Sequence, residues 1–147
     1  MTRIITFPIA TILFFSPLIH QAHSQEVGAR DTGFNVTLVR RTEFPPGFEA
    51  GITTTSYYPC AGYRMRPTVT WNSDTVSIDI GGFVRPSPCF ETMSRATGNV
   101  YLGDIADGKY LMRLRYRGDA DLYKLKVRNG QIAIDPIISK FTELIHE

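Results

Sequence analysis

The stretch KYLMRLRYRGDADLYKLKVRNGQIAID, residues 109–135, decides the fold of this chain. Apolar or aromatic residues alternate in it with residues that are mostly cationic, over 109–117 and again over 122–128. Such alternation is typical of β-strands that bury one face and expose the other to water. The dipeptide Asn129-Gly130 favours the φ > 0 geometry of a tight hairpin turn and leads into a third strand over 131–134. The pattern predicts three consecutive antiparallel strands, and with them an all-β protein.

The alternation also predicts a register for the first hairpin, in which apolar side chains meet on the inner face. These inward pairs are Tyr116–Tyr123, Leu114–Leu125 and Met112–Val127. The same register places like charges opposite each other on the outer face, which is locally unfavourable. The opposed cations are Arg115–Lys124 and Arg113–Lys126. We therefore expect acidic neighbours to compensate, either Asp135 across the next hairpin or Asp79 on a neighbouring strand.

The N-terminal end has the features of a secretory signal peptide. Met1-Thr2-Arg3 carries one positive charge, and residues 4–19 are mostly apolar and uncharged. Ala22-His23-Ser24 then supplies the small residues that precede a cleavage site. A membrane anchor is the weaker interpretation, because prolines interrupt a run that is short for a span. We expect a signal peptide over 1–24 and a secreted or periplasmic chain without a membrane span after cleavage.

Cleavage would leave residues 25–147, enough for a single domain with a modest core. Arg3 is removed with the signal, so the formal charge falls from +2 to +1. Nucleic-acid binding needs clustered Lys and Arg in excess. A nearly neutral chain therefore does not favour a nucleic-acid partner.

Two cysteines, Cys60 and Cys89, are present in a chain directed to an oxidising compartment. This context predicts one disulfide. The closed loop of about 30 residues would contribute on the order of 3–4 kcal/mol through chain entropy. Two sulfurs without nearby histidines leave a zinc ion short of ligands, so we expect neither a metal nor a cofactor.

Turn signals divide the remaining sequence into short strands. We expect them over 34–41, 52–58, 68–71, 75–80 and 100–105. The segment Phe83–Arg95 contains two prolines and Cys89, and predicts an ordered loop held by the disulfide. Seven or eight short strands predict an antiparallel β-sandwich. At the end, Asp135-Pro136 could cap a short C-terminal helix, with a continued strand or a floppy tail as the alternatives.

Residues 105–110, Ile-Ala-Asp-Gly-Lys-Tyr, resemble the loop and strand entry common in immunoglobulin-like domains. The resemblance covers roughly 100–134 and implies an immunoglobulin-like β-sandwich in which the hydroxyl of Tyr110 anchors the corner. The chain departs from antibody-type domains at Met112, where those domains carry their second cysteine. Each cysteine here follows a proline near a loop, so we expect the bridge to pin connections rather than cross the core. Such domains serve many unrelated functions, and the fold alone implies none.

Histidine usage argues against an enzyme with a catalytic triad. His20 and His23 lie in the expected signal peptide, and His146 is the penultimate residue. A Ser-His-Asp or Cys-His site needs an oriented imidazole. The two aspartate pairs cannot form one carboxylate or calcium site. Asp104 and Asp107 precede the strand 109–117, whereas Asp119 and Asp121 follow it, roughly 30 Å away. We interpret the second pair as turn-forming residues.

Two features offer recognition surfaces. The first is the outer face of the predicted hairpin, which could dock an acidic protein, a glycan or a lipid headgroup, with a plain solvated face as the alternative. Its cations are Arg113, Arg115, Lys124, Lys126 and Arg128. The second is the loop Phe83–Phe90, which prolines and the disulfide would stiffen as in a protease inhibitor. Its recognition residues would be Phe83, Arg85, Pro86, Ser87 and Pro88.

Two short motifs complete the set of candidates. Arg117-Gly118-Asp119 matches the integrin-binding tripeptide at the predicted hairpin tip, although such a turn needs Gly and Asp in any case. Asn35-Val36-Thr37 fits the glycosylation sequon. The leading hypothesis is a non-catalytic binding or accessory module of the cell envelope, and a protease inhibitor is the alternative.

Overall fold

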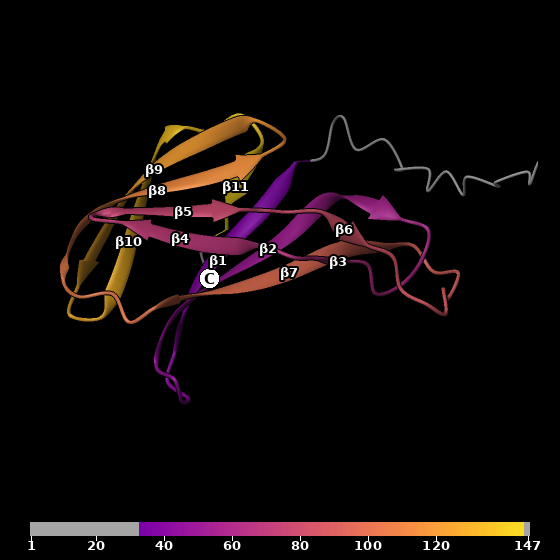
Figure 1. Cartoon of the computed structure of the whole chain (residues 1–147), viewed down its shortest axis with the longest axis horizontal. Helices are drawn as coiled ribbons and strands as arrows, with labels where there is room; N and C mark the ends of the chain where they lie inside the picture. The colour runs from indigo at the N-terminus through magenta and orange to yellow at the C-terminus, as the bar shows by residue number, and fades with distance from the viewer. Residues whose placement is uncertain (1–32, 146–147) are drawn as a thin grey trace, which may run out of the picture.

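Two β-sheets make up residues 33–145, the part of the chain that the computed structural model describes (Figure 1). Their strands are β1 (Phe34–Arg41), β2 (Gly47–Tyr58), β3 (Arg64–Met65), β4 (Thr68–Asn72), β5 (Thr75–Asp79), β6 (Phe83–Val84), β7 (Ser94–Gly103), β8 (Gly108–Tyr116), β9 (Asp119–Arg128), β10 (Gln131–Ile138) and β11 (Thr142–Leu144). One sheet has the order β11-β1-β2-β7-β3-β6 and the other β10-β9-β8-β5-β4. The prediction of an all-β sandwich is confirmed. The expected signal peptide, residues 1–24, lies outside the described residues.

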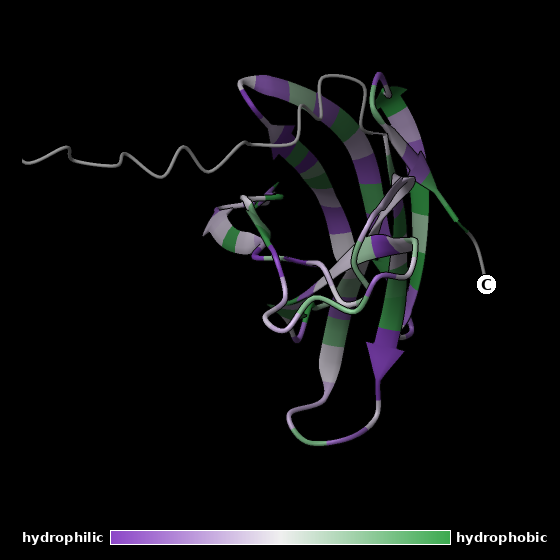
Figure 2. Cartoon of the chain, turned by 90° about the vertical axis from the view of Figure 1, so that its right-hand side faces the viewer, coloured by the Kyte–Doolittle hydropathy of each residue, from purple (hydrophilic) through white to green (hydrophobic). Residues whose placement is uncertain are grey.

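Side chains from the inner faces of both sheets form one core. Hydrophobic and hydrophilic residues alternate along the strands, as the sequence pattern predicts (Figure 2). The most deeply buried apolar residues include Phe34, Val36, Ala50 and Ile52 from one sheet, and Val76, Ile78, Met112, Leu114, Tyr123 and Leu125 from the other. Burying each large side chain of this kind stabilises the fold by about 1.5–3 kcal/mol.

Two-residue turns close both hairpins of the β8-β9-β10 meander. Arg117 and Gly118 have φ values of 50° and 92°, and Asn129 and Gly130 have 51° and 68°. Positive φ at both central residues matches the right-handed twist of the flanking strands. The predicted turn at Asn129-Gly130 is confirmed, and Arg117-Gly118 forms a second turn of the same kind.

The predicted register of the first hairpin is wrong by four residues. Met112 pairs with Tyr123, Leu114 with Asp121 and Tyr116 with Asp119. The predicted pairing of Tyr116 with Tyr123 would need a six-residue loop. Instead, Arg117 and Gly118 both take positive φ and form a two-residue turn. An even shift leaves every side chain on its predicted face, so the inward and outward sets remain correct.

The C-terminal segment is strand, and the predicted short helix is wrong. β10 continues through Pro136, where the register shifts, and β11 then pairs in parallel with β1. β10 is an edge strand, so the missing N–H of Pro136 leaves no ladder bond unmade. The continued strand, which the sequence left as an alternative, is what forms.

Of the remaining strands, β1 has the predicted bounds, 34–41, and others differ from prediction in length. β2 begins at Gly47 rather than at residue 52, and β7 begins at Ser94 rather than at residue 100. Part of the predicted loop Phe83–Arg95 is strand, because β6 pairs with β3. β3, β6 and β11 are short strands absent from the expected seven or eight.

The corner before β8 is anchored by Tyr110, as the resemblance implied. Its hydroxyl donates a hydrogen bond to the carbonyl oxygen of Ala106 at 3.0 Å. A Cβ atom at Gly108 would lie 3.0 Å from that hydroxyl, so glycine lets the ring lie across the corner. However, β5 pairs with β8 in parallel and β11 with β1 in parallel, whereas immunoglobulin sandwiches are described by two antiparallel sheets. The structure therefore shows an all-β, two-sheet fold without specifying that family.

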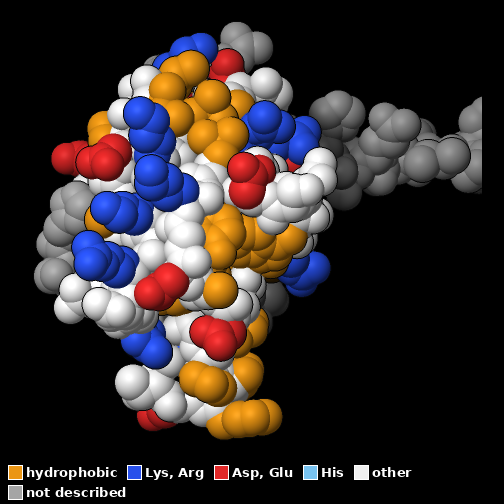
Figure 3. Space-filling model, turned by 90° about the vertical axis from the view of Figure 1, so that its left-hand side faces the viewer, with side chains coloured by type: hydrophobic (Ala, Val, Ile, Leu, Met, Phe, Trp, Pro, Cys, Tyr) orange, Lys and Arg blue, Asp and Glu red, His pale blue; other side chains and the backbone are white. Residues whose placement is uncertain are grey.

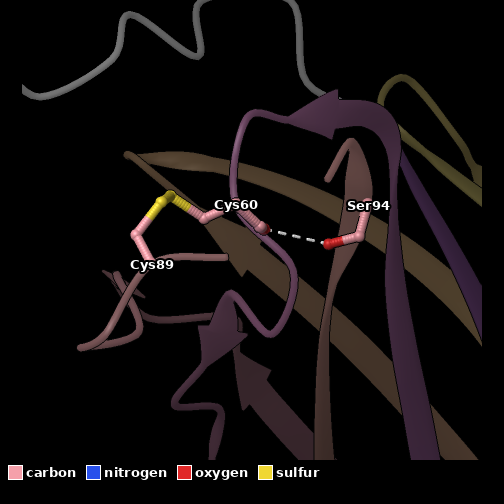
Figure 4. Close-up of a disulfide and its surroundings, with 3 residues drawn as sticks. All are labelled: Cys60, Cys89 and Ser94. Carbon is pink, nitrogen blue, oxygen red and sulfur yellow. Dashed lines mark hydrogen bonds between the residues drawn. A yellow bond between two sulfur atoms is a disulfide. The ribbon is translucent and has the colours of Figure 1, made fainter. Parts of the chain in front are cut away.

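The disulfide joins two connections beside the six-stranded sheet (Figure 4). Cys60 lies in the turn after β2, and Cys89 lies in the segment between β6 and β7. The hydroxyl of Ser94 donates to the carbonyl oxygen of Cys60 at 3.0 Å, which attaches the turn to β7. The predicted bridge is confirmed, and it pins connections as expected. Within residues 33–145, no helix is long and apolar enough to cross a membrane.

Replacing both cysteines, Cys60→Ser with Cys89→Ser, should lower the free energy of unfolding by about 3–4 kcal/mol, because the unfolded chain regains the freedom of the open loop. Urea denaturation followed by tryptophan fluorescence measures the change. Reducing the native chain should give the same loss, and the reductant should leave the double variant unaffected. Equal stability of the oxidised native chain and the double variant would contradict the role given to the bridge.

Candidate functional site

The candidate site is the outer side of β8 and β9, which we call the cationic face. It comprises six exposed Lys and Arg side chains, Lys109, Arg113, Arg115, Lys124, Lys126 and Arg128. A space-filling view shows a column of Lys and Arg side chains on one side of the molecule, with acidic side chains interspersed (Figure 3). All five cations named from the sequence are exposed as predicted, and Lys109 joins them because it has the same phase in β8.

The observed register spaces these cations more evenly than the predicted one. Arg113 lies opposite Leu122, Arg115 opposite Ala120, and Lys124 opposite Leu111. The predicted like-charge pairs Arg115–Lys124 and Arg113–Lys126 therefore do not form. Lys109 and Lys126 are the directly opposed cations that the face retains. Because fewer like charges lie directly opposite each other, the cations repel one another less, and the fold does not need an ion-pair network on this face.

Two carboxylates border the cationic face, and both are the ones expected from the sequence. Asp135 of β10 lies opposite Lys124, and Asp79 of β5 lies opposite Arg115. Within residues 33–145, none of the six cations lies within ion-pairing distance of a carboxylate; the ion pair that forms at 3.1 Å joins Arg41 and Glu49 elsewhere. The cations thus keep their donors for solvent or for an anionic ligand.

The geometry of the face is that of a regular array. Cations two residues apart on one strand are separated by about 6.6–6.8 Å, and neighbouring strands by about 4.8 Å. Leu111 and Leu122 lie half-buried between the charges. The arrangement can bind extended anions by charge and hydrogen bonding, with the apolar side chains filling the space between contacts.

The second candidate, the loop Phe83–Phe90, is partly built into the sheet. Phe83 pairs with Met65, and its half-buried ring lies 5.2 Å from Tyr58 and 6.4 Å from Tyr116 between ring centroids. Phe83 therefore belongs to the packing and is not a free contact residue. The other named residues lie nearer the surface, Arg85, Ser87 and Pro88 being exposed and Pro86 half-buried. Phe90, beside the disulfide, is 67% exposed.

Arg117-Gly118-Asp119 lies at the tip of the β8–β9 hairpin, as predicted. Arg117 and Gly118 supply the two positive φ angles, and Asp119 opens β9 opposite Tyr116. The guanidinium of Arg117 stacks over the ring of Tyr116 at 5.4 Å. The turn geometry accounts for these residue types without a ligand.

The sequon at Asn35 lies inside a paired strand. β1 is bonded to β2 on one side and to β11 on the other at this position. Asn35 is half-buried, and its Oδ1 is enclosed without a hydrogen-bond partner. Attachment of a glycan to the folded chain would require this side chain to leave its position.

Asp121 is the residue whose role the sequence did not reveal. Its interpretation as a turn-forming residue is wrong, because it lies fully buried in β9. Its carboxylate accepts hydrogen bonds from the backbone N–H groups of Lys140, Phe141 and Thr142, at 2.9, 3.1 and 2.8 Å, and from the Thr142 hydroxyl. These bonds hold the segment before β11 beside β1. Asp121 shares the phase of Tyr123 and Leu125, and that alternation is the signal that places it inward.

The other aspartate pair lies at the far end of β8. Asp107 accepts a hydrogen bond from the N–H of Asn129 at 2.9 Å, which joins the corner before β8 to the β9–β10 turn. Asp104 and Asp107 are exposed and well separated from Asp119 and Asp121 by the length of β8. In the described part of the chain, no group of three His, Cys, Asp or Glu side chains could hold a metal ion.

Comparison with known protein families, curated proteins and solved structures finds no match to this chain. The assignment of function therefore depends on the site itself.

Asp121→Asn should lower the free energy of unfolding by about 3 kcal/mol, because the amide keeps one acceptor oxygen and turns donors towards the backbone N–H groups. Thermal unfolding followed by circular dichroism measures the loss. The matched control is Asp119→Asn, an exposed carboxylate two residues away, which should leave the midpoint unchanged. If the two variants unfold at the same temperature, Asp121 does not anchor the C-terminal segment.

Proposed function

We propose that this chain is a secreted or periplasmic binding module of the cell envelope, built on an immunoglobulin-like sandwich, and that its cationic face binds an acidic polysaccharide. The carrying observation is that β8 and β9 expose six cations on one side, with Asp79 and Asp135 as their acidic neighbours on the adjoining strands. The proposal assigns the protein no catalytic step.

An acidic glycan fits the face better than a compact ligand does. Charges repeat along a linear polyanion, and cations repeat along each strand at about 6.6–6.8 Å. The near-neutral chain has a formal net charge of +2, so the positive potential is local to this face rather than general. An acidic protein and an anionic lipid surface are the competing partners that the experiment below distinguishes.

Two observations support an extracytoplasmic location. The disulfide Cys60–Cys89 persists in an oxidising compartment. The first 24 residues have the charge, the apolar run and the small residues of a signal peptide. The disulfide is consistent with export, and sequencing the N-terminus of the exported chain would test cleavage after Ser24.

The charge reversal Arg113→Glu with Lys126→Glu should weaken binding to a sulfated or carboxylated polysaccharide by at least about tenfold, since each reversal removes an attraction and adds a repulsion. Isothermal titration calorimetry at low and at physiological salt measures the affinity, which should fall as salt screens the charges. Anionic vesicles and polyglutamate, titrated in parallel, represent the lipid and protein partners and should bind more weakly.

Arg64→Glu with Arg66→Glu is the matched control, because these exposed cations lie on and beside β3, in the other sheet. The control should bind like the native chain. Equal affinity of both double variants, or tighter binding of vesicles or polyglutamate than of polysaccharide, would overturn the proposal.

Protease inhibition through Phe83–Phe90 is the second candidate, favoured by the exposure of Phe90 next to the disulfide. Under the function proposed above, a panel of serine and cysteine proteases should retain full activity at micromolar concentrations of the chain. Stoichiometric inhibition that Arg85→Ala or Phe90→Ala abolishes would instead establish the inhibitor.

A further inference from the structure

β10 is an edge strand with an unusually open side. The six-stranded sheet ends in the short strands β11 and β6, of three and two residues. At the other edge of the five-stranded sheet, β4 lies against β7: the indole N–H of Trp71 donates to the carbonyl oxygen of Leu102 at 2.9 Å. A Cβ atom at Gly98 of β7 would also lie 3.0 Å from Pro67, just before β4. Among the described residues, the opposite sheet reaches this edge at the turn before β10, where Arg40 of β1 donates a hydrogen bond to the carbonyl oxygen of Gly130 at 3.0 Å. β10 itself is a long edge strand of the five-stranded sheet.

The first four residues of β10 lack the usual protection of an edge. Natural sheets blunt their edges with Lys, Pro or bulges. In β10, Pro136 and the register shift come only after Asp135, and residues 131–134 carry no charge. The segment Gln131–Asp135 is thus a regular ladder open on one side.

The register shows which backbone groups face outward. Gln131 pairs with Arg128 directly across the two-residue turn, which makes them a pair that exchanges both hydrogen bonds. Ala133 and Asp135 follow in the same phase and bond to β9. The N–H and C=O groups of Ile132 and Ile134 consequently point away from β9.

We infer that β10 pairs with β10 of a second copy of this chain, antiparallel and centred on Ala133. Ile132 of each copy then exchanges two hydrogen bonds with Ile134 of the other, so all the outward groups of both residues are satisfied. The half-exposed side chains of Ile132 and Ile134 meet their counterparts on the core side. On the outer side, the two small Ala133 side chains meet at the centre without hindrance.

Charge complementarity supports this register over other occupants of the edge. Gln131 of one copy lies opposite Asp135 of the second copy, and its amide can donate to that carboxylate. Arg128 of β9 lies opposite Gln131 on its other side, and Lys124 of the second copy lies opposite Asp135 in the same way. The order of side chains across the four strands is therefore Arg128, Gln131, Asp135 of the second copy and Lys124 of the second copy. Each Asp135 carboxylate therefore sits between a cation of its own chain and a cation of the other chain.

The pairing has a consequence for the cationic face. A two-fold axis normal to the sheet relates antiparallel edge strands, so both cationic faces lie on the same side of one continuous sheet. Two linked faces bind a long polyanion with an effective concentration that a single face lacks. Self-pairing does not depend on the proposed function, and the experiment below contains no polysaccharide.

Sedimentation velocity of the purified chain tests the inference. The native chain should show a monomer–dimer equilibrium between 1 and 200 µM, a range of about two decades chosen to span weak and moderate association. Ala133→Lys should weaken dimerisation at least tenfold, because it places two cations directly opposite each other. Gln131→Lys adds the same charge two residues away but opposite Asp135 of the second copy, and should dimerise as tightly as the native chain or more tightly.

Both substituted positions are exposed, so neither variant is expected to unfold, and circular dichroism confirms this before sedimentation. A native chain that stays monomeric over the whole range overturns the inference. Equal weakening by the two lysines, or no weakening by Ala133→Lys, overturns the pairing through β10 as well.

Discussion

The two tight turns of the β8-β9-β10 meander are the constraint on which the rest of the structure depends. Arg117-Gly118 and Asn129-Gly130 take positive φ at both central residues, and these two-residue turns fix the register of the strands that they join. A slip of one residue would move every side chain to the other face. With the turns fixed, Asp121 faces the core, the cations face solvent, and β10 is left as the edge.

The sequence predicted the faces of these strands correctly and their register incorrectly, for one physical reason. Which face a side chain takes follows from local alternation, whereas register depends on how many residues the turn consumes. A register shifted by four residues gives the same two faces, so the apolar pattern could not discriminate between them. The decisive fact is that Arg117 takes a φ of 50°, which residues other than Gly, Asn and Asp seldom do.

Long-range pairing limited prediction in the same way at the C-terminus. Asp135-Pro136 has the local chemistry of a helix start, but β9 already holds the strand through that position. The anchor of the last strand is Asp121, which lies 19 to 21 residues upstream of the amides that it binds. For the site, exposure of the five predicted cations followed from the pattern, while their cross-strand neighbours required the register.

The central claim is that the outer side of β8 and β9 receives a polyanion, and an NMR titration of the ¹⁵N-labelled chain with an acidic oligosaccharide tests it most directly. The account predicts shift changes confined to the amides and side chains around Lys109, Arg113, Lys124 and Lys126, reversed by added salt. Changes concentrated in the segment between β6 and β7, or none at millimolar ligand, would contradict it.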